Sequence, residues 1–88
     1  MTNLDDAPAP NPVTKRDLAA LVGLLATLEG EILAQEVGPY LAERLSRRMV
    51  RDGLLTPAED STDDLCRALL RLNHRLRYSL GEYPERPN

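Results

Sequence analysis

The 88 residues are enough for one domain, and they include no tryptophan or phenylalanine. One cysteine and one histidine exclude an internal disulfide and a zinc site built from these residue types. The net charge is −3, with two basic residues against six acids in residues 1–36 and nine against eight in residues 37–88. This balance does not favour a nucleic-acid partner, although it does not exclude one.

The two ends of the chain differ in composition from its middle. Residues 1–13 hold three prolines and two aspartates but few large apolar side chains, so we expect a disordered tail there, and a second one at residues 84–88. Residues 14–83 are then the folded domain. No apolar run approaches the roughly 18 residues of a membrane span, and no signal peptide is evident. We therefore expect a cytoplasmic protein without a membrane span.

A first helix is predicted to begin at Thr14, whose hydroxyl can cap the first turn, with Asp17 three residues on. Apolar residues then recur at spacings of three and four, as on one face of an α-helix. This stripe consists of Leu18, Leu21, Val22, Leu25, Leu28, Ile32 and, after a shift, Gln35.

A second helix is predicted from Pro39 to about Asp52. Proline is favoured at the first helical position, so Gly38-Pro39 separates the two helices. Gly53 suits the left-handed position after a helix, and Leu54 would make the hydrophobic contact that accompanies such an ending.

The third helix has an ambiguous beginning. Thr56 and Glu59 match a capping box around Pro57, but Ser61 or Thr62 could cap again further on. Either a short turn precedes the main helix, or one helix begins with a frayed end. The main run is a leucine repeat ended by Gly81: Leu65, Leu69, Leu72, Leu76 and Leu80. Together the three helices predict an all-α fold, a small antiparallel three-helix bundle.

No group of residues indicates catalysis, a metal or a cofactor. Cys66 and His74 lie eight residues apart on one predicted helix, about 12 Å along its axis, which is too far for a hydrogen-bonded pair. We interpret Cys66 as a small apolar residue at a helix seam and His74 as solvent-facing. The acids from Glu59 to Asp64 suit a helix start and lack the pattern of a calcium loop. The sequence therefore predicts a protein that is not an enzyme.

Arginines form two stripes at helical spacing, one on each of the last two helices. They are interpreted either as a solvated, salt-bridged face or as a surface for an anion or an acidic partner. The residues are Arg44, Arg47, Arg48 and Arg51 on the second helix, and Arg67 and Arg71 on the third.

Three leucines fall outside the predicted buried faces: Leu24, Leu33 and Leu70. Because so small a core supplies little stability, exposed leucines favour an interface. The leading hypothesis is thus a helical interaction or assembly protein, acting as a homodimer or as a subunit bound to another helical protein. A small anion- or nucleic-acid-binding regulator that uses the face from Arg44 to Arg51 is the alternative.

Residues 43–76 also resemble a known family. The matching features are Glu43-Arg44, Arg47-Arg48, Gly53, the Leu55-Thr56 and Glu59 signal, and the leucine repeat that starts at Leu65. In these residues the chain is similar to the gas vesicle protein K family. The resemblance implies a third possibility, an accessory role in gas vesicle assembly without catalysis.

Overall fold

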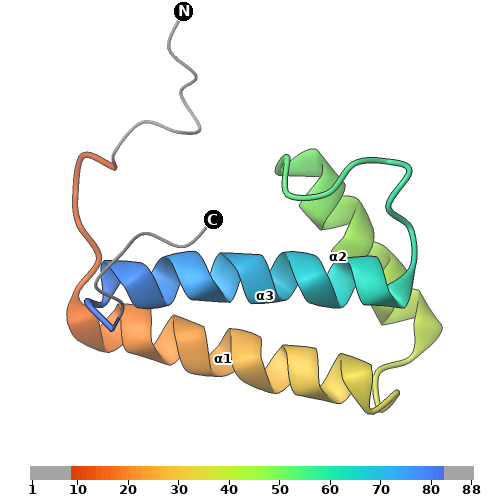
Figure 1. Ribbon diagram of the computed structural model, residues 1–88, viewed down its shortest axis with the longest axis horizontal. Helices are drawn as coiled ribbons and strands as arrows, with labels where there is room; N and C mark the ends of the chain where they lie inside the picture. The colour runs from red at the N-terminus through yellow and green to blue at the C-terminus, as the bar shows by residue number, and fades with distance from the viewer. Residues whose placement is uncertain (1–8, 83–88) are drawn as a thin grey trace, which may run out of the picture.

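The computed structural model describes residues 9–82, and these form three α-helices without a strand (Figure 1). The helices are α1 (Lys15–Leu33), α2 (Pro39–Arg51) and α3 (Thr62–Ser79). The predicted all-α fold is confirmed. Of the two predicted tails, residues 9–13 are exposed and lie outside any helix, whereas residues 1–8 and 84–88 lie outside the described part of the chain.

The helices α1 and α3 form the main pair. They lie side by side, run in opposite directions and share the most extensive packing (Figure 1). Helix α2 packs on α3 and crosses behind it at a steep angle, near the end where α1 finishes and α3 begins. Because α2 crosses α3 steeply, it packs on α3 near that end rather than along its whole length.

The core is centred on the start of α3. Leu65 is fully buried there, and Leu69 is 3% exposed. Ile32 of α1, Met49 of α2 and Leu55 of the connecting loop pack into the same cluster. The leucine repeat predicted for the third helix therefore faces the interior where α2 covers it.

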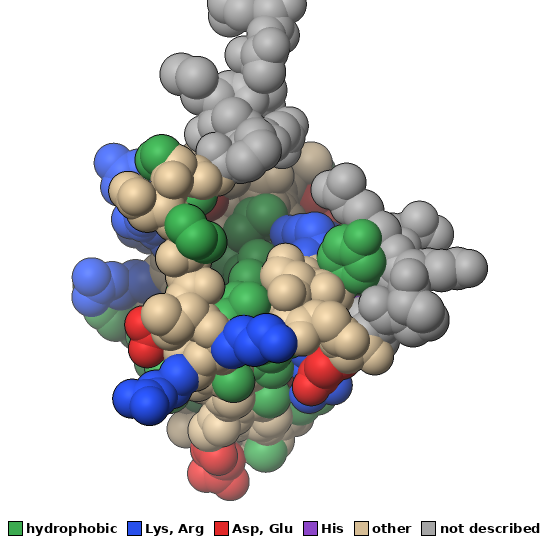
Figure 2. All heavy atoms as spheres, turned by 90° about the vertical axis from the view of Figure 1, so that its left-hand side faces the viewer, with side chains coloured by type: hydrophobic (Ala, Val, Ile, Leu, Met, Phe, Trp, Pro, Cys, Tyr) green, Lys and Arg blue, Asp and Glu red, His purple; other side chains and the backbone are tan. Residues whose placement is uncertain are grey.

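The opposite end of the α1–α3 pair is less covered. Leu18 of α1 and Leu72, Leu76 and Leu80 of α3 are only half-buried. Viewed from that end, hydrophobic side chains reach the surface along the middle of the molecule, and basic side chains stand out along its left edge (Figure 2). The apolar residues are thus fully buried where α2 packs and only half-buried at the other end.

All three helix starts use a residue expected from the sequence. The Thr14 hydroxyl accepts a hydrogen bond from the Asp17 backbone N–H at 3.2 Å. Gly38 precedes Pro39 at the start of α2. Helix α3 begins at the later of the two predicted caps, because Ser61 and Asp64 form the capping box.

Each helix ends in the same left-handed turn. Gly53 has φ +78° after α2, and Gly81 has φ +85° after α3. The Leu54 N–H donates to the Met49 carbonyl at 2.8 Å, which completes the motif predicted there. After α1 the left-handed residue is not a glycine but Gln35, which has φ +59° and lies beyond the end of the helix instead of extending its apolar stripe. The prediction that Gln35 continues the helix is wrong.

Candidate interaction surfaces

All three leucines predicted for an interface are exposed, but they do not share one surface. The exposed fractions are 68% for Leu24, 59% for Leu33 and 41% for Leu70. Leu33 and Leu70 line the same surface hollow between α1 and α3. Leu24 precedes Leu33 by nine residues, which is two and a half helical turns, so it lies on the other side of α1.

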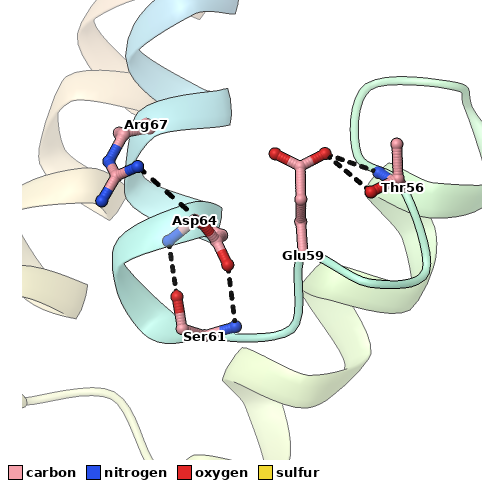
Figure 3. Close-up of polar contacts among 5 residues, drawn as sticks. All are labelled: Thr56, Glu59, Ser61, Asp64 and Arg67. Atoms are coloured by element: carbon pink, nitrogen blue, oxygen red, sulfur yellow. Dashed lines mark hydrogen bonds and ion pairs between the residues drawn. The ribbon is translucent and has the colours of Figure 1, made fainter.

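We call the depression between α1 and α3 the seam hollow. It has a volume of about 330 Å³ and is lined by Glu29, Leu33, Asp63, Cys66, Arg67 and Leu70. Its apolar surface therefore lies next to two carboxylates. The guanidinium of Arg67 stands 3.9 Å from a carboxylate oxygen of Asp64, an ion pair drawn in Figure 3.

The single thiol lies at the seam hollow. Cys66 is 5% exposed and belongs to the core cluster, as expected for a small apolar residue at a helix seam. Burial raises the pKa of the Cys66 thiol, and the negative charges of Glu29 and Asp63 raise it further. A protonated, covered thiol contributes packing rather than nucleophilic reactivity.

The outer face of α2 carries the arginine stripe, defined as Arg44, Arg47, Arg48 and Arg51. A second hollow of about 450 Å³ is lined by these four side chains alone. Arg47 pairs with Glu43, and Arg48 Nε lies 3.0 Å from a carboxylate oxygen of Asp52. Both pairs join exposed residues four apart on α2, and such pairs typically stabilise by about 0.5 kcal/mol or less. An external anion could therefore replace Glu43 and Asp52 as the partner of these arginines with little loss of stability.

The guanidinium of Arg44 has an aromatic neighbour. It lies 5.7 Å from the ring centre of Tyr40, one turn earlier on α2. The Tyr40 side chain is itself 71% exposed. The arginine stripe therefore offers aromatic surface as well as positive charge.

The two arginines predicted on the third helix do not extend this stripe. Arg67 pairs with Asp64. Hydrogen bonds with Thr56 and Ser61 are the main causes that lower the pKa of Glu59 and of Asp64, and the positive charge of Arg71 adds to them. Both arginines thus act on carboxylates near the start of α3. The stripes on α2 and α3 are separate surfaces with different electrostatic surroundings.

The segment before α3 is a turn rather than a helix, which decides between the two starts predicted from the sequence (Figure 3). The Glu59 carboxylate accepts hydrogen bonds from the Thr56 backbone N–H and hydroxyl, both at 2.9 Å. These bonds lower the pKa of Glu59. The Asp64 carboxylate accepts a hydrogen bond from the Ser61 backbone N–H at 3.3 Å, and hydrogen bonding to the Ser61 side chain and backbone lowers the pKa of Asp64.

That turn closes a groove that sequence reasoning missed. The groove has a volume of about 490 Å³ and lies between α2, the turn and the start of α3. Ala42, Val50 and Leu65 supply apolar surface, and Glu43 and Asp60 are among its charged residues. Its walls come from segments separated in the chain, so no local pattern could have indicated it.

Two neighbouring polar residues of α3 are withdrawn from solvent. His74 is half-buried and interacts with neighbouring groups, which corrects its assignment as solvent-facing. Asn73 is 3% exposed, and its Nδ2 donates to the Val22 carbonyl of α1 at 3.0 Å. Within residues 9–82, no three His, Cys, Asp or Glu side chains are grouped so that they could hold a metal ion.

The comparisons with known proteins yield no relative. No family model, no curated protein and no solved structure matches the chain. Among the described helices, none combines the length and the apolar character that crossing a bilayer requires.

Proposed function

We propose that this protein is a non-enzymatic interaction module that assembles with itself or with another helical protein. The observation that carries the proposal is the seam hollow, where the exposed Leu33 and Leu70 lie beside two carboxylates. An apolar surface with a charged rim is the usual anatomy of a protein interface. A domain with so small a core also gains stability from such a contact.

The arginine stripe supports a second candidate function, the binding of an anion. A hollow lined by four guanidinium groups suits phosphate or carboxylate oxygens. Two features weigh against nucleic acid as the ligand: the net charge of −3, and the acids Glu43 and Asp52, which pair with two of the four arginines. We therefore rank this function second.

The resemblance to the gas vesicle protein K family agrees with an assembly role and would specify its setting. That setting stays a prediction from the sequence, as does a cytoplasmic location.

Sedimentation of the full chain across micromolar concentrations tests the proposal. The expected result is a mass above that of the monomer, reduced to the monomer by Leu33→Glu together with Leu70→Glu. Leu24→Glu is the control, because this leucine is also exposed but lies on the other side of α1. A wild-type chain that remains monomeric throughout overturns self-assembly. A mass that falls only with Leu24→Glu assigns the interface to the other face.

A further inference from the structure

We propose that the seam hollow binds the arginine stripe of a second copy of this chain, so that copies associate head to tail. The inference rests on the proposed function, and it names both surfaces of the contact. It follows from three properties of the described residues: the chemistry of the hollow, the chemistry of the stripe and their placement on the fold.

The seam hollow suits an arginine side chain. Leu33 and Leu70 can cover the aliphatic part of the side chain, while Glu29 and Asp63 offer carboxylates to its guanidinium. Guanidinium groups match carboxylates in shape and charge, and they desolvate more readily than an ammonium group. Arg67 also lines the hollow, but it pairs with Asp64 outside it, so the two carboxylates outnumber the one guanidinium and the hollow favours a basic side chain over an acidic one.

The stripe offers the complementary surface. Its four arginines point outward from α2, and exposed apolar side chains accompany them, Tyr40 at 71% and Leu41 at 48%. Burying these side chains against Leu33 and Leu70 would add an apolar contribution to the charge pairing. The ion pairs that Arg47 and Arg48 make within α2 are exposed and weak, so they do not prevent exchange for a partner's carboxylates.

The two surfaces lie on opposite sides of the molecule. Leu65 lies on the side of α3 that faces α2, because Leu65 and residues of α2 line the same groove beside the turn. Asp63 and Leu70 are two residues before and five after Leu65, which places them about 160° and 140° around α3 from it. The seam hollow thus looks away from α2, and the arginine stripe lies on the outer face of α2.

Surfaces on opposite sides cannot both be used in one closed two-fold dimer. A contact between two different surfaces of the same chain is heterologous, and it propagates to a ring or an open chain. Each copy would donate its stripe to one neighbour and its hollow to the next. The inference therefore predicts association beyond the dimer, which weakens as salt screens the charges.

Two double variants test this arrangement. The hollow variant carries Glu29→Lys and Asp63→Lys, and the stripe variant carries Arg44→Gln and Arg48→Gln. Each variant retains one intact surface and lacks the other. Charge-matched controls use exposed residues of α1 or of its connecting loop, Glu31→Lys with Glu36→Lys and Lys15→Gln with Arg16→Gln. Circular dichroism confirms that every variant remains helical before sedimentation.

The expected result is specific to a heterologous contact. Each double variant alone sediments as a monomer, the 1:1 mixture forms a dimer that grows no further, and both controls assemble like the wild type. Assembly of the wild type that neither variant reduces overturns this inference while leaving the proposed function intact. Two variants that stay monomeric when mixed also overturn it. A wild type that is monomeric and binds a short DNA duplex through the stripe overturns both proposals.

Discussion

Asn73 of α3 donates a hydrogen bond from Nδ2 to the backbone carbonyl of Val22 in α1, with the two atoms 3.0 Å apart. Both residues are buried, at 3% and 7% exposure. The bond fixes how α1 and α3 align along their length. Seven residues back from Asn73 is Cys66, and seven residues on from Val22 is Glu29, and these two meet at the seam hollow. The register set by one amide therefore places the candidate interface.

Replacing Asn73 by aspartate should destabilise the fold strongly. The carboxylate has the same shape but no donor, and it would be buried facing the carbonyl oxygen of Val22. We expect a loss of about 2–4 kcal/mol in the free energy of unfolding at pH 7, measured by urea denaturation. Asn73→Ala should cost less, because it removes the hydrogen bond without introducing a charge.

The Asn73→Asp variant also has a pH signature. Burial raises the pKa of a carboxyl group, and a protonated carboxyl group can donate the missing hydrogen bond. The gap in stability between this variant and the wild type should therefore narrow as the pH falls. A gap that is independent of pH would mean that residue 73 is hydrated in solution.

Gln35→Gly should stabilise the protein. Gln35 holds φ +59° at the end of α1, a conformation that costs an L-residue roughly 1 kcal/mol and costs glycine little. Part of this gain is lost because glycine also has more freedom in the unfolded chain, so we expect an increase of about 0.5 kcal/mol or less. Thermal and urea unfolding measure it.

The matched control for that substitution is Gln35→Val. A β-branched residue tolerates the left-handed region poorly, so this variant should be less stable than the wild type. Equal stability of the glycine and valine variants would show that the turn after α1 is not left-handed in solution.

Acid should weaken the fold through two carboxylates, Glu59 of the α2–α3 connection and Asp64 in the first turn of α3. Hydrogen bonds with Thr56 and Ser61 hold the pKa values of Glu59 and Asp64 below their ordinary range. A carboxylate whose pKa is lowered by folding contributes stability above its unfolded pKa of about 4, and this contribution is lost as the pH falls through the folded value. Urea unfolding between pH 7 and pH 2 measures the loss.

Substitution of the two carboxylates tests whether they cause the loss of stability in acid. Glu59→Gln and Asp64→Asn should lower the stability at pH 7 and flatten its decline in acid. Glu31→Gln, an exposed acid on α1, is the control and should leave the decline unchanged. An unaltered acid profile in the double variant would place the titrating groups elsewhere.

The helices could be predicted because their signals are local. Thr14, Pro39 and Gly53 act through hydrogen bonds and backbone angles within a few residues, and each lies where the sequence indicated. The left-handed Gln35 could not be anticipated, because its side chain does not favour that conformation and the surrounding turn imposes it.

The surfaces were harder to predict because they depend on how helices are placed in space. The exposure of Leu24, Leu33 and Leu70 follows from periodicity within each helix. That Leu33 meets Leu70 while Leu24 lies apart depends on the register between α1 and α3. A buried asparagine sets that register, and in the sequence it resembles any polar residue beside a leucine stripe.

Replacing a buried and an exposed leucine by alanine should change the free energy of unfolding by very different amounts. Leu65 is fully buried, so Leu65→Ala should cost about 2–5 kcal/mol, a large part of the total stability of so small a domain. Leu24 is 68% exposed, and alanine is the better helix former, so Leu24→Ala should change the stability by less than about 0.5 kcal/mol. Urea unfolding at several protein concentrations measures both. A cost for Leu24→Ala that grows with protein concentration would show that a second copy covers this face of α1, and it would move the interface away from the seam hollow.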